Sequence, residues 1–485
     1  MHDSQLHQNN TFWSNIIWKL LERFGVQGVQ FIIQIILARL LSPEHYGILS
    51  LMIIFTTLAN VFIQNGFNTS LIQNKDVTEE DYSSVFWFSL GIAVILYIIL
   101  FAAAPLVAAF YKMPDIITPF RVISLMLIPG AFNSIQVAKV SREMNFKKVF
   151  YSNIIGTVIS GMAGIAAAYM GLGLWALVIQ TLLNVTVACI VMLFTVNWHP
   201  TLVCDLKRIK VLLSYGWKLL VSALLDTLYQ DLSSLVIGKK YDSGMLGQYN
   251  RGKQFPQFIV NGVNGSIQSV LLPALSLKQE DRKQVKTLMR TSMTLSAYII
   301  FPMMAGLAGI AEPLVSLILT DKWLPCVPYL QIFCFSFAFW PVHTSNLQAI
   351  NAMGRSDIFL KLEIIKKIYG IAALIIAVFC FDSPIAIAMT GGITSVISSF
   401  VNAFPNKKLI DYSYFEQMKD ILPSFLLSAV MFGIVVMIGT MNLAPIITLF
   451  VQIISGIVFY ILFSFILKIR PFVFLLDNFF HRLKG

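Results

Sequence analysis

The sequence predicts an all-α integral membrane protein with fourteen transmembrane helices, two pseudo-symmetric six-helix lobes and a C-terminal helix pair. Three observations lead to this fold class. Hydrophobic residues make up 57% of the 485 residues and charged residues only 12%, unlike a soluble chain. Apolar windows of about 20 residues, the length that crosses a hydrocarbon core, follow one another from end to end. Finally, short stretches of the first half recur about two hundred residues later.

The connections between the expected helices are too short to hold a soluble domain. The polar N-terminus lacks a basic stretch and a cleavage site, so we expect no cleaved signal peptide and a retained first helix. The helices are expected near residues 14–37, 46–66, 84–110, 117–138, 149–170, 174–197, 211–237, 246–272, 290–309, 326–352, 359–381, 384–403, 421–440 and 443–467.

The distribution of positive charge supports the count of fourteen and sets the orientation. With both termini in the cytoplasm, twenty-six Lys and Arg residues fall on the cytoplasmic side and five on the other. Positive residues concentrate on the cytoplasmic side of membrane proteins, and one missed helix would scramble this split. The net charge of +11 therefore has a membrane explanation, and we expect no nucleic-acid partner.

An internal repeat divides the chain. "LARLLSPEHYGILSL" (37–51) resembles "IGKKYDSGMLGQYNR" (237–251), with Gly47 matching Gly247. "LIPGAFNSIQVAKVSREMNF" (127–146) resembles "FWPVHTSNLQAINAMGRSDIF" (339–359), with Pro129 matching Pro341. The predicted division is 1–205 for helices 1–6, 206–404 for helices 7–12, and 405–485 for helices 13–14 and a cytoplasmic tail. Two such halves with the same orientation in the membrane are typical of transporters that bind substrate between them. The alternative is a repeat without function.

Polar side chains form stripes along the first two helices of each half. A spacing of three or four residues keeps a set on one helix face. The stripes are Lys19, Arg23, Gln27, Gln30 and Gln34 in helix 1; Thr57, Asn60, Gln64 and Asn68 in helix 2; Lys218, Ser222, Asp226, Tyr229 and Ser233 in helix 7; and Asn250, Gln254, Gln257, Asn261, Asn264 and Gln268 in helix 8, with Arg251 and Lys253 near its outer end.

We interpret the four stripes as the walls of one hydrophilic lumen, because charge inside hydrocarbon is costly and should face a wet cavity or a partner. The alternatives are interhelical hydrogen bonding for the amides and hydroxyls, and snorkelling to the headgroups for Lys19 and Arg23. Amides and hydroxyls suit a multiply hydroxylated sugar. The excess of Lys and Arg favours a phosphate or an acidic sugar.

Catalysis, cofactors and metals have no support in the sequence. The chain lacks GxSxG, Walker A, HExxH and Gly-rich dinucleotide motifs, and its six histidines are scattered. The five cysteines lack CxxC spacing, so neither a zinc site nor a disulfide framework is expected. The largest predicted outer loop, about residues 310–325, is small for an enzyme of glycan assembly. We expect a protein that is not an enzyme and that binds no cofactor.

The chain resembles the Wzx-type polysaccharide flippases, in particular the branch with colanic-acid and teichuronic-acid exporters, within the superfamily of MATE exporters and lipid II flippases. The resemblance covers about residues 13–470 and depends on the order and spacing of several strings. These are "LARLLSPEHYG" (37–47), "FNTSLIQNKDVTEEDYSSVFW" (67–87), "LGQYNRGKQFP" (246–256), "LLPALS" (271–276) and "DKWLPCVPYLQI" (321–332).

This resemblance implies a two-lobed bundle that moves an undecaprenyl-pyrophosphate-linked oligosaccharide across a bacterial inner membrane by alternating access. It implies a cationic lumen, in which Arg23, Lys218, Arg251 and Lys253 contact pyrophosphate or acidic sugar. Asp226 and Asp231 become candidates for coupling to H⁺ or Na⁺. The partners it implies are membrane lipids, the lipid-linked oligosaccharide, a glycan polymerase and a chain-length regulator.

The full set of predicted substrate-binding residues contains side chains from all four stripes. It comprises Lys19, Arg23, Gln27, Gln30, Gln64, Lys218, Ser222, Tyr229, Asn250, Arg251, Lys253, Gln254, Gln257 and Asn261. Three other functions stay open at this point. A MATE-like exporter of small cations would carry more carboxylates in its lumen, a membrane enzyme would need larger outer loops, and a scaffold of glycan assembly would need no lumen.

Overall fold

The computed structural model describes residues 25–64, 78–143, 145–203, 205–441 and 443–484. Within them the chain is helical and contains no strand. The first half holds α2 (Gln27–Leu40), α3 (Pro43–Gln64), α5 (Glu79–Tyr111), η2 (Pro114–Ile116), α6 (Ile117–Ser124), α7 (Leu127–Arg142), α8 (Phe146–Tyr169), α9 (Leu174–Thr195) and α10 (Leu206–Lys240). This confirms the all-α class.

The second half continues with long helices and several shorter ones. They are α11 (Ser243–Ser276), α12 (Arg282–Gly309), α13 (Ala311–Leu319), η3 (Asp321–Cys326), α14 (Val327–Ala338), α15 (Trp340–Ala352), α16 (Ser356–Cys380), α17 (Pro384–Ala403), α18 (Asn406–Ile410), α19 (Tyr414–Gly439), α20 (Pro445–Ile466) and α21 (Arg470–Lys484). Helices α13, α18 and α21 lie where the sequence predicted connections and a tail.

Twelve helical segments of the described chain are long and apolar enough to cross a membrane. They account for twelve of the fourteen predicted spans. Of the other two, the predicted helix 14–37 is described only from residue 25, and its described part contains α2. Helix α16 has 25 residues but carries Lys361, Glu363, Lys366 and Lys367 in its first half.

Helix starts precede the predicted ones wherever a polar cap extends the helix beyond its apolar window. At α5 the Thr78 hydroxyl accepts from the Asp81 N–H at 3.3 Å, and the Asp81 carboxylate accepts from the Thr78 N–H at 2.9 Å. This reciprocal capping satisfies donors that the first turn leaves open. Asp281 caps α12 and Ser413 caps α19 through side-chain oxygens. The apolar pattern alone could not locate these polar first turns.

Two of the predicted helices are broken, and the breaks are repeat-equivalent. The predicted helix 117–138 ends at Ser124 and restarts at Leu127, and the predicted helix 326–352 is interrupted at Phe339. Pro129 and Pro341 stand just after the breaks. Because proline lacks an N–H and its ring clashes with the carbonyl four residues back, a straight helix through either site is disfavoured. The second repeat string therefore encodes the same kink in both halves.

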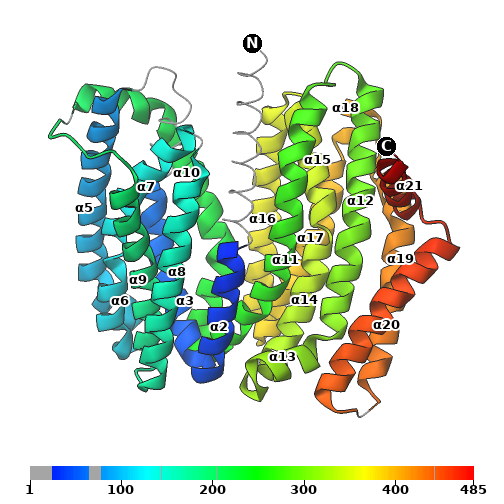
Figure 1. The fold of residues 1–485 in the computed structure, drawn as a ribbon, viewed down its shortest axis with the longest axis horizontal. Coiled ribbons are helices and arrows are strands. Elements are labelled where there is room, and N and C mark those ends of the chain that lie inside the picture. The colour runs from blue at the N-terminus through cyan, green and yellow to red at the C-terminus, as the bar shows by residue number, and fades with distance from the viewer. Residues whose placement is uncertain (1–24, 65–77, 144, 204, 442, 485) are drawn as a thin grey trace. The chain divides into compact units, whose positions relative to one another are not determined.

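The chain forms two compact units, Met1–Gly247 and Gln248–Gly485. In the first, α5, α6, α7 and α9 lie side by side, and α3 packs against α7 and α10 (Figure 1). In the second, α12 packs against α14, α15 and α19, and α19 against α20 (Figure 1). The Tyr298 hydroxyl donates to Ser464 Oγ at 2.9 Å, which ties α12 to α20. The predicted three-part division at 205 and 404 stays a prediction.

The first repeat string produces a close backbone contact within residues 1–247. A side chain at Gly47 would collide with the Ser243 carbonyl, and one at Gly247 would collide with the Pro43 carbonyl. The added Cβ atoms would also lie 3.1 Å and 3.2 Å from the backbone nitrogens of Gly247 and Gly47, respectively. The two repeat-equivalent first turns thus meet through their glycines, and each glycine makes room for the other copy.

Replacing either glycine by alanine should therefore destabilise the protein. The obstacles are backbone atoms, which cannot rotate away, so we expect Gly47→Ala and Gly247→Ala each to cost about 1–3 kcal/mol of stability. Thermal unfolding in detergent measures it. Gly433→Ala is the matched control, because an added Cβ in that α19 position meets nothing within 4 Å and alanine favours a helix. Equal melting temperatures for all three variants would contradict the close contact.

Candidate substrate-binding site

Arg251, near the start of α11, is buried against the segment that connects α13 to α14. Its side chain is 5% exposed, and its guanidinium carbon lies 4.9 Å from the centre of the fully buried Trp323 ring. It donates to Gln254 Oε1 at 2.7 Å. An arginine over an indole is attracted by the ring quadrupole, and this attraction grows when water is excluded. Arg251 is thus held in a fixed position by its own unit.

The backbone around Arg251 fits the same segment closely. The Gln248 side chain donates to the Lys322 carbonyl at 2.8 Å, and a Cβ at Gly252 would lie 2.8 Å from the Cys326 carbonyl oxygen. The Tyr249 and Tyr329 rings meet edge to face at 5.8 Å. Two strings far apart in the sequence, 246–256 and 321–332, therefore build one packed site. Both strings contribute to the family resemblance, but the sequence does not indicate that they are in contact.

The other residues of the predicted α11 stripe differ in exposure. Asn250, Lys253 and Gln257 are half-buried, whereas Gln254 and Asn261 are exposed. Asn264, which follows Asn261 in the stripe about one helical turn later, is buried. A helix carrying amides at this spacing presents many weak donors and acceptors on one side. That this side binds the substrate stays a prediction.

A polar pocket of about 260 Å³ lies in the first unit between α3, α7 and α9. Gln64 and Asn60 reach it from α3, and Asn133 and Ser134 from α7. The side-chain oxygens of Asn60 and Asn133 are buried and accept no hydrogen bond from any described residue. Buried amide oxygens of this kind are costly unless a donor reaches them. The pocket is therefore suited to hydroxyl groups or water, which could supply those donors.

The remaining predicted residues lie on α2 and α10 or outside the described part. Gln27 and Gln30 are exposed on α2, and Ser222 is exposed on α10. Tyr229, Asp226 and Asp231 are half-buried, and Asp226 accepts from the Gln230 amide at 2.7 Å. Lys19 and Arg23 lie outside the described residues, as does the side chain of Lys218. Whether these groups line one lumen stays a prediction.

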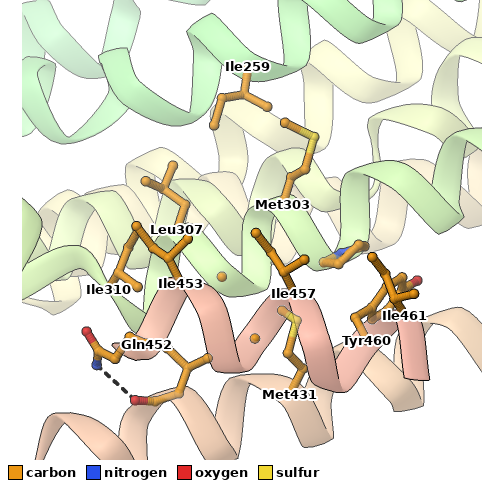
Figure 2. A pocket seen from close by; sticks show the side chains of 14 residues that line it. Ile259, Met303, Leu307, Ile310, Met431, Gln452, Ile453, Ile457, Tyr460 and Ile461 are labelled. Atoms are coloured by element: carbon orange, nitrogen blue, oxygen red, sulfur yellow. Dashed lines mark hydrogen bonds between the residues drawn. The ribbon is translucent and has the colours of Figure 1, made fainter. Parts of the chain in front are cut away.

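An apolar groove of about 470 Å³ opens in the second unit, between α12, α19 and α20, with Ile259 of α11 at its edge (Figure 2). Met303, Met431 and Ile457 point into it from three different helices (Figure 2). The Gln452 amide donates to the Val435 carbonyl at 2.8 Å, and the Tyr460 hydroxyl donates to the Tyr298 carbonyl at 2.9 Å. The buried Gln452 Oε1 accepts no hydrogen bond from the described residues, and the rest of the lining is apolar. The groove therefore offers an aliphatic ligand an apolar wall.

Sequence reasoning missed this groove and half of the polar pocket. The turns of α12, α19 and α20 that line the groove are largely apolar all round, so no stripe distinguishes a groove-lining face from a lipid-facing one. Asn133 and Ser134 are neighbours in α7, a helix in which polar and apolar residues are mixed, and they belong to no polar stripe with a spacing of three or four residues. Among the described residues, no group of three or more His, Cys, Asp and Glu side chains could hold a metal ion.

Residues 36–328 match the model of a family described as polysaccharide biosynthesis protein. The chain belongs to this family. The chain is 23% identical to the teichuronic acid biosynthesis protein TuaB of Bacillus subtilis over 78% of both chains. It is 22% identical to the lipopolysaccharide biosynthesis protein WzxC of Escherichia coli over 74% of this chain and 73% of that one. The resemblance found in the sequence is confirmed.

The fold matches solved structures of membrane transport proteins. The lipid II flippase MurJ in an inward closed conformation superposes with a TM-score of 0.72 at 16% identity, over 93% of this chain and 98% of that one. An inward-facing multidrug MATE transporter gives 0.60 at 13% identity, over 81% and 99%. The chain is a multi-pass protein of a bacterial cytoplasmic membrane. The two solved structures that share its fold are transport proteins.

The packing of Arg251 generates a prediction about stability. Arg251→Met removes the guanidinium from the Trp323 ring and from Gln254, so we expect a loss of about 2 kcal/mol and a lower melting temperature. Arg282→Met is the control, since this arginine is exposed at the start of α12. If both variants have the melting temperature of the wild type, the contacts of Arg251 with Trp323 and Gln254 do not stabilise the protein.

Proposed function

We propose that the protein is a flippase that translocates a lipid-linked oligosaccharide, carried on undecaprenyl pyrophosphate, across the cytoplasmic membrane by alternating access. Its substrate has a long aliphatic part and a polar, anionic part. The observation that carries the proposal is that α11 borders both kinds of surface. Ile259 edges the apolar groove, while Asn250, Gln257 and Asn261 form a polar stripe on the same helix.

Each surface suits one part of that substrate. A polyprenyl chain gains about 25 cal/mol for each Å² of apolar surface that it buries in the groove. The sugar hydroxyls suit the amides of α11 and the buried oxygens of Asn60 and Asn133. The pyrophosphate suits Arg23, Lys218, Arg251 and Lys253, since charge-assisted hydrogen bonds are the stronger ones. Family membership and the MurJ-like fold support this assignment.

The proposal includes fourteen spans with both termini in the cytoplasm: the twelve spans, α16, and the predicted first helix, of which α2 is in the described part. It also includes Asp226 and Asp231 as the groups that couple transport to H⁺ or Na⁺, because carboxylates inside a membrane bundle mark ion paths. A glycan polymerase and a chain-length regulator are the proposed partners on the product side.

The test of the proposal is translocation in reconstituted vesicles, followed through the accessibility of a lipid-linked anionic oligosaccharide to an outside reagent. Wild-type protein should accelerate the transfer. Arg23→Ala and Lys218→Ala should each slow it by at least tenfold, the effect of losing one charge-assisted bond of about 1.5–3 kcal/mol. Lys408→Ala is the control, because Lys408 is exposed on α18.

A second pair of variants tests the groove in the same assay. Ile457→Asn places an amide in the groove wall and should slow translocation, whereas Ile454→Asn changes the same helix at a residue outside the lining. Acceleration that survives Ile457→Asn, Arg23→Ala and Lys218→Ala would keep the function and refute the site. Folded wild-type protein that accelerates nothing would refute the flippase itself.

A further inference from the structure

A polar pocket of about 330 Å³ lies between α12, α19 and the start of α21, apart from both surfaces described above. Its polar lining consists of Arg290, Thr291, Thr294, Asp420 and Arg470, and its apolar lining of Leu295, Pro471 and Phe474. Two arginines and one carboxylate give this lining a net positive charge. All three elements belong to the second unit, and α21 packs against α12.

The pocket lies at the edge of the apolar surface. Helix α20 is a candidate span, and its last turn exposes Phe465 and Ile466 at 65% and 57%. Arg470 follows Ile466 by four residues and opens α21. Exposed large apolar side chains on a transmembrane helix face lipid tails, so the first arginine beyond them lies at headgroup depth.

The carboxylate of the pocket is already engaged. Arg290 donates to one oxygen of Asp420, and the Tyr412 hydroxyl donates to the other at 2.7 Å. The Asp420 side chain is 8% exposed. The Tyr412 pKa is raised above its usual value, chiefly by burial and then by the hydrogen bond to Asp420, so the hydroxyl keeps its proton.

The other charged groups around the pocket form a network beside it. Glu416 accepts from Lys286 at 3.1 Å and lies 3.8 Å from Arg290. No ion pair joins Arg470 to a carboxylate among the residues whose side chains are described. A guanidinium carries five N–H donors, so Arg290 can serve Asp420 and still face an anion together with Arg470.

Helix α21 adds an apolar side next to this charge. Val473, Phe474 and Leu475 are 37%, 47% and 42% exposed directly after Arg470. A helix with basic and apolar faces at the end of a span is typical of helices that lie in the membrane interface. An anion that binds here would therefore sit at headgroup depth, with exposed apolar side chains beside it that can hold the acyl chains of a lipid.

We propose that this pocket binds the phosphate of an anionic membrane phospholipid, whose acyl chains lie along the exposed apolar side chains of α20 and α21. Arg470 contacts the phosphate in a forked pair, Arg290 supports it, and the bound lipid fastens α21 to α12. The lipid is a permanent neighbour of the protein and not its transported substrate, so the proposal stands independently of the flippase assignment.

The test titrates the purified full chain in detergent with phosphatidylglycerol, and reads bound lipid by native mass spectrometry and the melting temperature. Wild-type protein should bind the lipid and melt higher. Arg470→Gln should need about tenfold more lipid for the same effect, and Arg470→Lys should fall between, because lysine keeps the charge and loses the fork. Lys408→Gln removes an equal charge from an exposed site on α18 and should behave as wild type.

Phosphatidylcholine and inorganic phosphate are the comparison ligands, and neither should raise the melting temperature. Three results would overturn the proposal: equal binding by Arg470→Gln and wild type, equal stabilisation by phosphatidylcholine, or an effect of inorganic phosphate that matches that of the lipid. The first result would show that the lipid binds elsewhere than in this pocket. The second would show that binding needs no anionic headgroup. The third would show that the ligand is free phosphate and not a membrane lipid.

Discussion

Hydrocarbon offers no hydrogen-bond partner to a backbone N–H or C=O, and most features of this protein follow from that constraint. A chain that crosses a membrane must satisfy its backbone within itself, which helices do and open strands do not. Interruptions in the helices are therefore costly and need a cause. The breaks before Pro129 and Pro341 have one, because no N–H is available there to continue the ladder.

The same constraint leaves specificity to side chains and to close backbone packing. Where the repeat-equivalent first turns meet, Gly47 and Gly247 allow backbone atoms within about van der Waals distance of each other. At Arg251 the charge is accommodated by an indole, an amide and a tightly fitted glycine turn. At both sites a residue that is difficult to bury, a close backbone contact or a charge, packs against a neighbour from a distant part of the chain.

The sequence predicted the helical class, the family and twelve of the spans, because apolar length and repeat strings are local signals. It predicted neither the contact between Arg251 and Trp323 nor the groove around Ile457. Both depend on tertiary packing, and the sequence pattern of one helix does not indicate which other helix packs against it. The capped starts of α5 and α12 were also missed, since polar first turns lie outside apolar windows. The sequence predicted connections at α13 and α18 and a tail at α21, because none of these helices is long enough to give an apolar window of about 20 residues.

The proposed flippase carries a lipid-linked glycan from the cytoplasmic to the outer leaflet, with the aliphatic part in the groove and the polar part on the α11 side. The sidedness of lipid-linked oligosaccharide in living cells depleted of the protein measures this activity. We expect the lipid-linked pool to grow and to be reachable only from the cytoplasmic side. A pool of unchanged size that remains reachable from outside would contradict it.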